Sequence, residues 1–170
     1  ALLGASVDMG SGVGDRETYE ALLEERLNAV TAGARPRRLE ILNFSVDGYD
    51  PLRRLLALEA KALRFQPRAA WYVAHPGNDM FLLKQHLQRM RSQGVAPPFG
   101  FMTGILERAG VNHGTPDALV AKKLDSCGNE IRSRLYGRLV SFCQRHGMLP
   151  VCVVLPELWG TDDELVQVEI

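Results

Sequence analysis

The chain has 170 residues, enough for one domain with a sizeable core, and its 46% hydrophobic and 24% charged residues are typical of globular proteins. Twenty Lys and Arg residues balance twenty Asp and Glu residues, and a formal net charge of zero argues against a nucleic-acid-binding protein. The longest apolar runs are far shorter than the roughly 20 residues that a membrane-spanning helix needs. No motif indicates a metal or cofactor site, because the three cysteines fit no zinc or redox spacing.

In chain order, short apolar segments alternate with longer amphipathic ones. This alternation predicts an α/β fold, in the form of a three-layer α/β/α sandwich with a central parallel sheet. Asp15 is expected to cap the first helix, and the last long helix could be broken near Cys127-Gly128. The predicted strands cover residues 1–5, 39–44, 69–74 and 149–155, and the predicted helices cover residues 17–30, 51–64, 80–92 and 117–146.

The remaining segments are less regular. Residues 94–116 are expected to form a surface insertion or lid with some helix in it, within a single domain. The aromatic residues and Met at 99–102 could wall an acyl pocket, or they could form a small core of the insertion itself. Residues 162–170 are expected to begin a further helix. Cys143 and Cys152 lie in apolar surroundings and are expected to be buried thiols.

Three predicted strands end in loops whose residues suit chemistry, and the carboxyl ends of parallel strands share one edge of a sheet. Ser6 follows the first strand, where a base could activate its hydroxyl. Gly48 follows the second strand, and the backbone of a glycine can approach a site closely. Asn78 follows the third strand, and its amide can donate to an oxyanion. Each residue alone has a commoner structural use, in a helix cap or a tight turn.

Taken together, the three loops resemble the SGNH hydrolase family, also called the GDSL esterases and lipases. Gly4-Ala5-Ser6 resembles the Gly-Asp-Ser block that follows the first strand of that family. Asn43 and Gly48 match its second block, and Gly77-Asn78-Asp79 matches its third. The order and the predicted strand context agree in all three loops, and the resemblance covers essentially the whole chain.

The resemblance implies a flavodoxin-like fold and a serine hydrolase that acts on ester bonds without a cofactor. Ser6 would attack the carbonyl carbon of the ester, and the N–H of Ser6, the N–H of Gly48 and the side chain of Asn78 would stabilise the oxyanion. The implied partner is a small-molecule, carbohydrate or lipid ester, as for an esterase, a lipase or a carbohydrate deacetylase. The balanced charge, independently of the resemblance, predicts no nucleic-acid partner.

Three departures from the family pattern matter. Ala5 replaces the Asp of Gly-Asp-Ser, which is not the catalytic acid, and Pro76 replaces a Gly, which could change how Asn78 is aimed. The family also takes its base from an Asp-x-x-His block near the C-terminus, and no histidine of this chain follows an Asp by three positions. The histidines are His75, His86, His113 and His146. The simplest interpretation is a chain that stops before the last strand and this block, so that little or no hydrolase activity is expected from it alone.

Other interpretations stay open. His75 adjoins Asn78 and could line the site or act as a substitute base, although hydrogen bonding or packing is the usual role of such a residue. The domain could also transfer acyl groups, or bind a carbohydrate or lipid partner without catalysis. Nucleotide binding through residues 10–14 is disfavoured, because the spacing is Gly-x-Gly-x-Gly and no acidic residue ends the second predicted strand.

Overall fold

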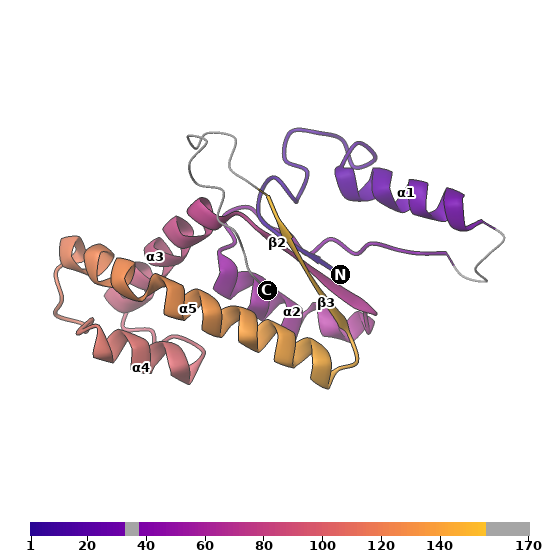
Figure 1. The fold of residues 1–170 in the computed structure, drawn as a ribbon. Coiled ribbons are helices and arrows are strands. Elements are labelled where there is room, and N and C mark those ends of the chain that lie inside the picture. Colours follow the sequence, from indigo (N-terminus) through magenta and orange to yellow (C-terminus); the bar gives the residue numbers. More distant parts are fainter. Residues whose placement is uncertain (33–37, 156–170) are drawn as a thin grey trace.

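The computed structural model describes residues 1–32 and 38–155. Its strands are β1 (Leu2–Leu3), β2 (Ala69–Ala74) and β3 (Leu149–Val154). They form a parallel sheet in the order β1-β2-β3, with Leu2 opposite Trp71 and Tyr72 opposite Cys152. Helices connect these strands (Figure 1), so the α/β class predicted from the alternation of segments is confirmed.

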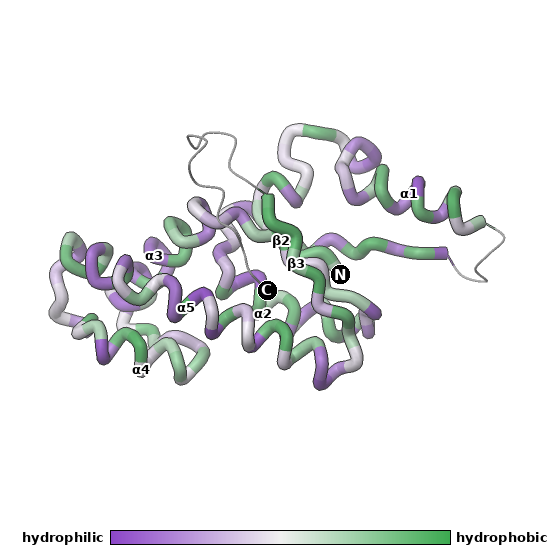
Figure 2. The backbone as a smooth tube through the Cα atoms, viewed as in Figure 1, coloured by the Kyte–Doolittle hydropathy of each residue, from purple (hydrophilic) through white to green (hydrophobic). Residues whose placement is uncertain are grey.

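One helical layer covers a face of this sheet. The helices are α1 (Tyr19–Thr31), α2 (Pro51–Ala60), α3 (Pro76–Ser92), α4 (Gly100–Arg108) and α5 (Asp117–Arg145), with a short 3₁₀ helix η1 (Ala62–Phe65) after α2. Figure 1 shows α2, α3, α4 and α5 packed together, with α5 touching the other three, while α1 lies beyond the strands on the other side. Figure 2 shows that the strands are strongly hydrophobic, whereas hydrophobic and hydrophilic residues alternate along α5.

The core lies between the strands and this helical layer. Leucines at helical spacing on α2 and apolar residues on α5 are almost completely buried against Tyr72 of β2. They include Leu52, Leu55, Leu58, Leu124, Ile131 and Leu135. Burial of such a side chain stabilises the fold by about 1.5–3 kcal/mol, so this interface holds the strand ends in place.

The predicted strand over residues 39–44 is reduced to one parallel bridge between Asn43 and Leu2. The N–H of Leu2 donates to the carbonyl of Leu42 at 2.8 Å, so this segment lies beside β1. Its first half is held by side chains of α1 instead of by a strand. Asn28 bonds both the N–H and the carbonyl of Leu39, and Glu24 accepts from the N–H of Ile41. The position of the segment is as predicted, but its length as a strand was wrong.

Two features of the first and last helices also differ from the prediction. The first helix begins at Tyr19, and Thr18 caps it by accepting from the N–H of Ala21 at 3.4 Å, so the cap assigned to Asp15 was wrong. The last helix runs without a break through Cys127 and Gly128, because both residues are buried against neighbouring helices instead of marking a turn.

The segment at 94–116 contains α4, which packs on α5 and contributes to the main core. Phe99, Met102 and Ile105 are buried there, so the residues at 99–102 belong to the shared core and not to one of their own. Cys143 is buried as expected, but Cys152 is exposed, so the expected burial of its thiol was wrong. The helix expected to begin at residue 162 lies outside the described residues. No helix in the described part is long and apolar enough to cross a membrane.

Candidate active site

Ser6 opens a tight turn directly after β1. The carbonyl of Ala5 accepts from the N–H of Met9 at 2.9 Å, and the carbonyl of Ser6 accepts from the N–H of Ser11 at 3.2 Å. Ser6 is half-buried, and neither its N–H nor its hydroxyl has a hydrogen-bond partner within residues 1–32 and 38–155. Both groups are therefore available to a ligand at this end of the sheet.

Gly48 lies in a turn between the Asn43 segment and α2. The N–H of Tyr49 donates to the carbonyl of Val46 at 3.1 Å, and Gly48 has a φ of +70°, which favours glycine. Its carbonyl accepts from Arg53, whereas its N–H has no acceptor in the part of the chain that the structure describes. The turn thus presents one free backbone donor, as an oxyanion site requires.

Asn78 is exposed in the first turn of α3 and not in a loop, which corrects the predicted helix start at residue 80. The helix begins earlier because Pro76 suits its first position. Asp79 closes the turn in both directions. Its N–H donates to the carbonyl of His75 at 2.7 Å, and its carboxylate accepts from the N–H of His75 at 3.0 Å. Asn78 therefore has a defined backbone at the positive end of the helix dipole.

A buried carboxylate, Asp8, joins the Ser6 turn to the start of α3. Its Oδ2 accepts from the N–H of Ala5 at 2.7 Å and lies 3.0 Å from Nε2 of His75. Its Oδ1 accepts from the hydroxyl of Tyr19 at 3.2 Å. Donors from the turn, from α1 and from the residue just before α3 thus meet on one side chain that is fully buried.

Asn43 ties its own segment to the same point. Its side-chain amide donates to the carbonyl of Asp8 at 2.7 Å and to Glu20 at 2.5 Å, and its oxygen accepts from the N–H of Ser45 at 2.9 Å. Because Asn43 also bridges to Leu2, the segment that leads to Gly48 is fixed against both β1 and the Ser6 turn.

A second set of polar contacts holds α2 and α3 together at the end of β2. Arg54 of α2 is buried, donates to the carbonyl of Val73 at 2.7 Å and places Nη2 2.7 Å from Oδ1 of Asp79. Asp50 caps α2 by accepting from the N–H of Leu52 at 2.8 Å, and its other oxygen lies 2.8 Å from Nδ1 of His86 in α3.

Burial and hydrogen-bond donors have opposite effects on the pKa of Asp8. Burial disfavours the charged form of Asp8, but the hydrogen bonds from His75 and Ala5 and the nearby charges of His75 and Arg54 hold its pKa below the ordinary value. Burial and the charge of Asp8 raise the pKa of Tyr19, so its hydroxyl stays protonated and donates. Asp8 is therefore an anion that neighbouring donors hold in place at neutral pH.

The structure brings together the three segments that contain Ser6, Gly48 and Asn78. The contacts that join these segments are made by Asp8, Asn43 and other neighbours of the three residues. The ring of His75 faces Asp8, and no hydrogen bond links it to Ser6, so nothing in the described residues makes His75 the base for that hydroxyl.

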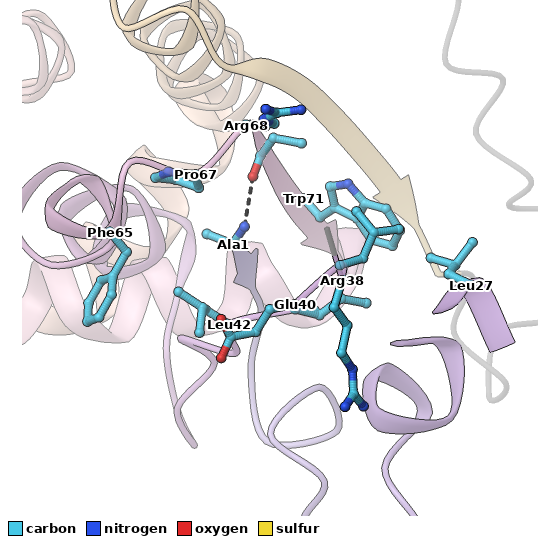
Figure 3. A pocket seen from close by; sticks show the side chains of 12 residues that line it. Ala1, Leu27, Arg38, Glu40, Leu42, Phe65, Pro67, Arg68 and Trp71 are labelled. Atoms are coloured by element: carbon cyan, nitrogen blue, oxygen red, sulfur yellow. Dashed lines mark hydrogen bonds between the residues drawn. The ribbon is translucent and has the colours of Figure 1, made fainter. Parts of the chain in front are cut away.

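A large hollow lies at the other end of the sheet. It has a volume of about 710 Å³ and is lined by residues at the amino ends of β1 and β2, among them Ala1, Arg68 and Trp71 (Figure 3). The N-terminal amine of Ala1 donates to the carbonyl of Ala69 at 2.7 Å beside it. Because Ser6, Gly48 and Asn78 follow the carboxyl ends of their segments, we do not assign this hollow to the candidate site.

Comparisons with protein-family models, with curated proteins and with solved structures find no match to this chain. Within the described residues, no group of three or more His, Cys, Asp or Glu side chains has an arrangement that could hold a metal ion.

Proposed function

We propose that this chain forms the nucleophile and oxyanion-hole part of a serine hydrolase that acts on ester bonds and resembles the SGNH hydrolases. Ser6 attacks the carbonyl carbon of the ester. The N–H groups of Ser6 and Gly48 and the side-chain amide of Asn78 donate to the negatively charged oxygen of the tetrahedral intermediate. The proposal also implies that the whole fold is a flavodoxin-like three-layer sandwich, in which ligands bind at the carboxyl edge of the sheet.

One observation supports this proposal above the others. The turns at Ser6 and Gly48 each present a backbone N–H that no described residue accepts, and hydrogen bonds through Asp8 and Asn43 hold both turns at the same edge of the sheet. Ser6 and Gly48 are only partly buried, so water can occupy these donors when no ligand is bound, and an oxyanion hole presents backbone N–H groups to a ligand in the same way.

The proposal does not identify the general base that would activate Ser6. A serine hydroxyl needs a general base to become an effective nucleophile, and the 170 residues contain no Asp-x-x-His block. The proposal therefore assigns to this chain the nucleophile and the oxyanion donors, but not the base.

The test is covalent labelling of Ser6 in the full-length protein with a fluorophosphonate, which reacts with activated serines. In the wild-type protein we expect one label per chain, on the peptide that contains Ser6. The Ser6→Ala variant should not be labelled. The Ser11→Ala variant, which changes another serine of the same turn, should be labelled as fully as the wild type. Equal labelling of Ser6→Ala and the unchanged protein would overturn the assignment.

An acyl-transferring or purely binding domain is the second candidate, because the sequence lacks the base block. Steady-state assays separate the candidates. A hydrolase releases free acid from p-nitrophenyl acetate in water, whereas an acyltransferase needs an alcohol acceptor, and a binding domain is not labelled at Ser6.

A further inference from the structure

We propose that Asp8 and His75 act as a pair of positioning residues that set the Ser6 turn at a fixed distance from the first turn of α3, where Asn78 lies. This inference rests on the proposed hydrolase function, since it concerns the same site. Asp8 lies two positions after Ser6 and His75 lies three positions before Asn78, and the two side chains meet across 67 residues of sequence.

The first step is the fixed position of Asp8. Its side chain is fully buried and accepts from the N–H of Ala5, the residue immediately before Ser6. The fit is close, because a Cβ added at Gly4 would lie 2.2 Å from Oδ2 of Asp8. The bond from the N–H of Ala5 therefore couples the position of the carboxylate to the backbone that presents Ser6.

The second step is the fixed position of His75. It is the N-terminal cap of α3, and its backbone N–H and carbonyl are both bonded to Asp79, whose carboxylate is paired with buried Arg54. Pro76 then restricts the next backbone angle. The backbone of His75 is thus fixed relative to the first helical turn, and the contact of Nε2 with Asp8 orients the imidazole ring.

The third step is the direction of the hydrogen bond. Asp8 is ionised at neutral pH because its pKa is low, so its carboxylate accepts and Nε2 of His75 donates. Burial strengthens this bond, because a charge-assisted bond competes less with water there. Neither residue bonds the hydroxyl of Ser6 in the described structure, so the pair acts through geometry and not through proton transfer to the substrate.

The test compares variants of the full-length protein in an ester-hydrolysis assay. Displacement of a catalytic group by about 1 Å can lower the rate by about 100-fold. We therefore expect His75→Ala and Asp8→Asn to lower kcat by about 10- to 100-fold with little change in KM. His75→Gln, whose amide can donate in place of Nε2, should recover much of the loss. His113→Ala, an exposed histidine, is the control and should retain full activity.

If Asp8 and His75 act as a pair, the effects of their replacement on kcat should not be independent. Because one hydrogen bond is lost in either single variant, the double variant should be about as impaired as the worse single one. Multiplied losses, or wild-type kcat in both single variants, would overturn the inference. Absence of Ser6 labelling in the unchanged protein would instead overturn the proposed function, so the two failures are distinguishable.

A measurement on the wild-type protein tests the inference even if the variants do not fold. Two-bond ¹⁵N–¹H correlation spectra at neutral pH report which ring nitrogen of His75 carries the proton. We expect a protonated Nε2. An unprotonated Nε2 would show that the bond to Asp8 is absent and would overturn the inference.

Discussion

Arg54 and Asp79 form a buried ion pair at the end of β2, with Nη2 of the guanidinium 2.7 Å from Oδ1 of the carboxylate and side-chain exposures of 0% and 4%. The same guanidinium donates to the carbonyl of Val73 at 2.7 Å. A strand end, the body of α2 and the first turn of α3 are thus held by one cation. The position of Asn78 depends on this pair, because Asp79 is its chain neighbour.

Replacement of Arg54 by Met leaves the carboxylate of Asp79 buried without its partner. We expect the free energy of unfolding to fall by about 3–5 kcal/mol, the usual result of breaking a buried pair from one side. Urea denaturation gives this value directly. Arg108→Met is the matched control, because its pair with Glu130 is 63% and 41% exposed and such surface pairs contribute less than about 1 kcal/mol. Equal losses in the two variants would show that the buried pair is not formed in solution.

Gly4→Ala introduces a methyl group where Asp8 already lies, with the new Cβ 2.2 Å from Oδ2 and 2.3 Å from Cβ of that residue. We expect a loss of about 1–3 kcal/mol in unfolding free energy, as for other overpacked core positions. Gly137→Ala should change the unfolding free energy in the opposite direction. Gly137 is exposed in α5 with open space around it, so alanine there should stabilise the fold by about 0.5–1 kcal/mol. Thermal unfolding of both variants checks the two signs.

Periodicity and turn residues were enough to predict most elements of this fold. The apolar spacing on α2 and α5 and the apolar runs of β2 and β3 gave boundaries within a few residues of the observed ones, except at the end of α2, where residues 62–65 form the short 3₁₀ helix η1 instead. These signals are local, because each depends on neighbours along the chain. The start of α3 was misplaced by four residues, since the Gly-Asn-Asp sequence was interpreted as a turn although Pro76 before it favours a helix.

The polar network could not be predicted in the same way. The sequence placed His75 near Asn78, but its partner Asp8 lies 67 residues away and carries no signal of its own. Likewise, Asn28 and Glu24 bind the backbone of residues 39–41 only because α1 folds back beside that segment. Such contacts are set by tertiary packing, which spacing and composition do not encode.

Because the pKa of Asp8 is lowered in the folded protein, the free energy of unfolding depends on pH in the acid range. Burial opposes its ionisation, and the hydrogen bonds from His75 and Ala5, with the charges of His75 and Arg54, more than offset it. Tyr19 donates to the same carboxylate. Because the pKa is lower in the folded state, the unfolded chain takes up the proton first. Asp8 therefore stabilises the fold above its ordinary pKa of 3.8, and this contribution is lost as pH falls through the lower folded value.

The corresponding variant is Asp8→Asn, measured by urea denaturation from about pH 2 to about pH 7. We expect the variant to be less stable than the unchanged protein above about pH 5, with a difference that shrinks steadily on acidification. Asp47→Asn, at an exposed position of the turn before Gly48, is the control and should follow the unchanged protein throughout. A constant difference at all pH values would show that the charge of Asp8 is not what stabilises the fold.

Asn78→Ala separates transition-state stabilisation from substrate binding. If its amide donates to the oxyanion of the tetrahedral intermediate, its removal should lower kcat by about 10²- to 10³-fold, while KM changes little, because the interaction is made in the transition state and not in the bound ester. Gln85→Ala, at an exposed position farther along α3, is the control for a general effect on the helix and should retain wild-type kcat.

Asn78→Asp is a stricter test of the oxyanion role, because it keeps the shape of the side chain and replaces the donor by a charged acceptor. Repulsion between two negative oxygens should reduce kcat at least as much as the alanine variant does above the pKa of the new carboxyl group. If Asn78→Asp and Asn78→Ala both kept full turnover, the oxyanion would be stabilised elsewhere, and the first turn of α3 would serve the fold alone.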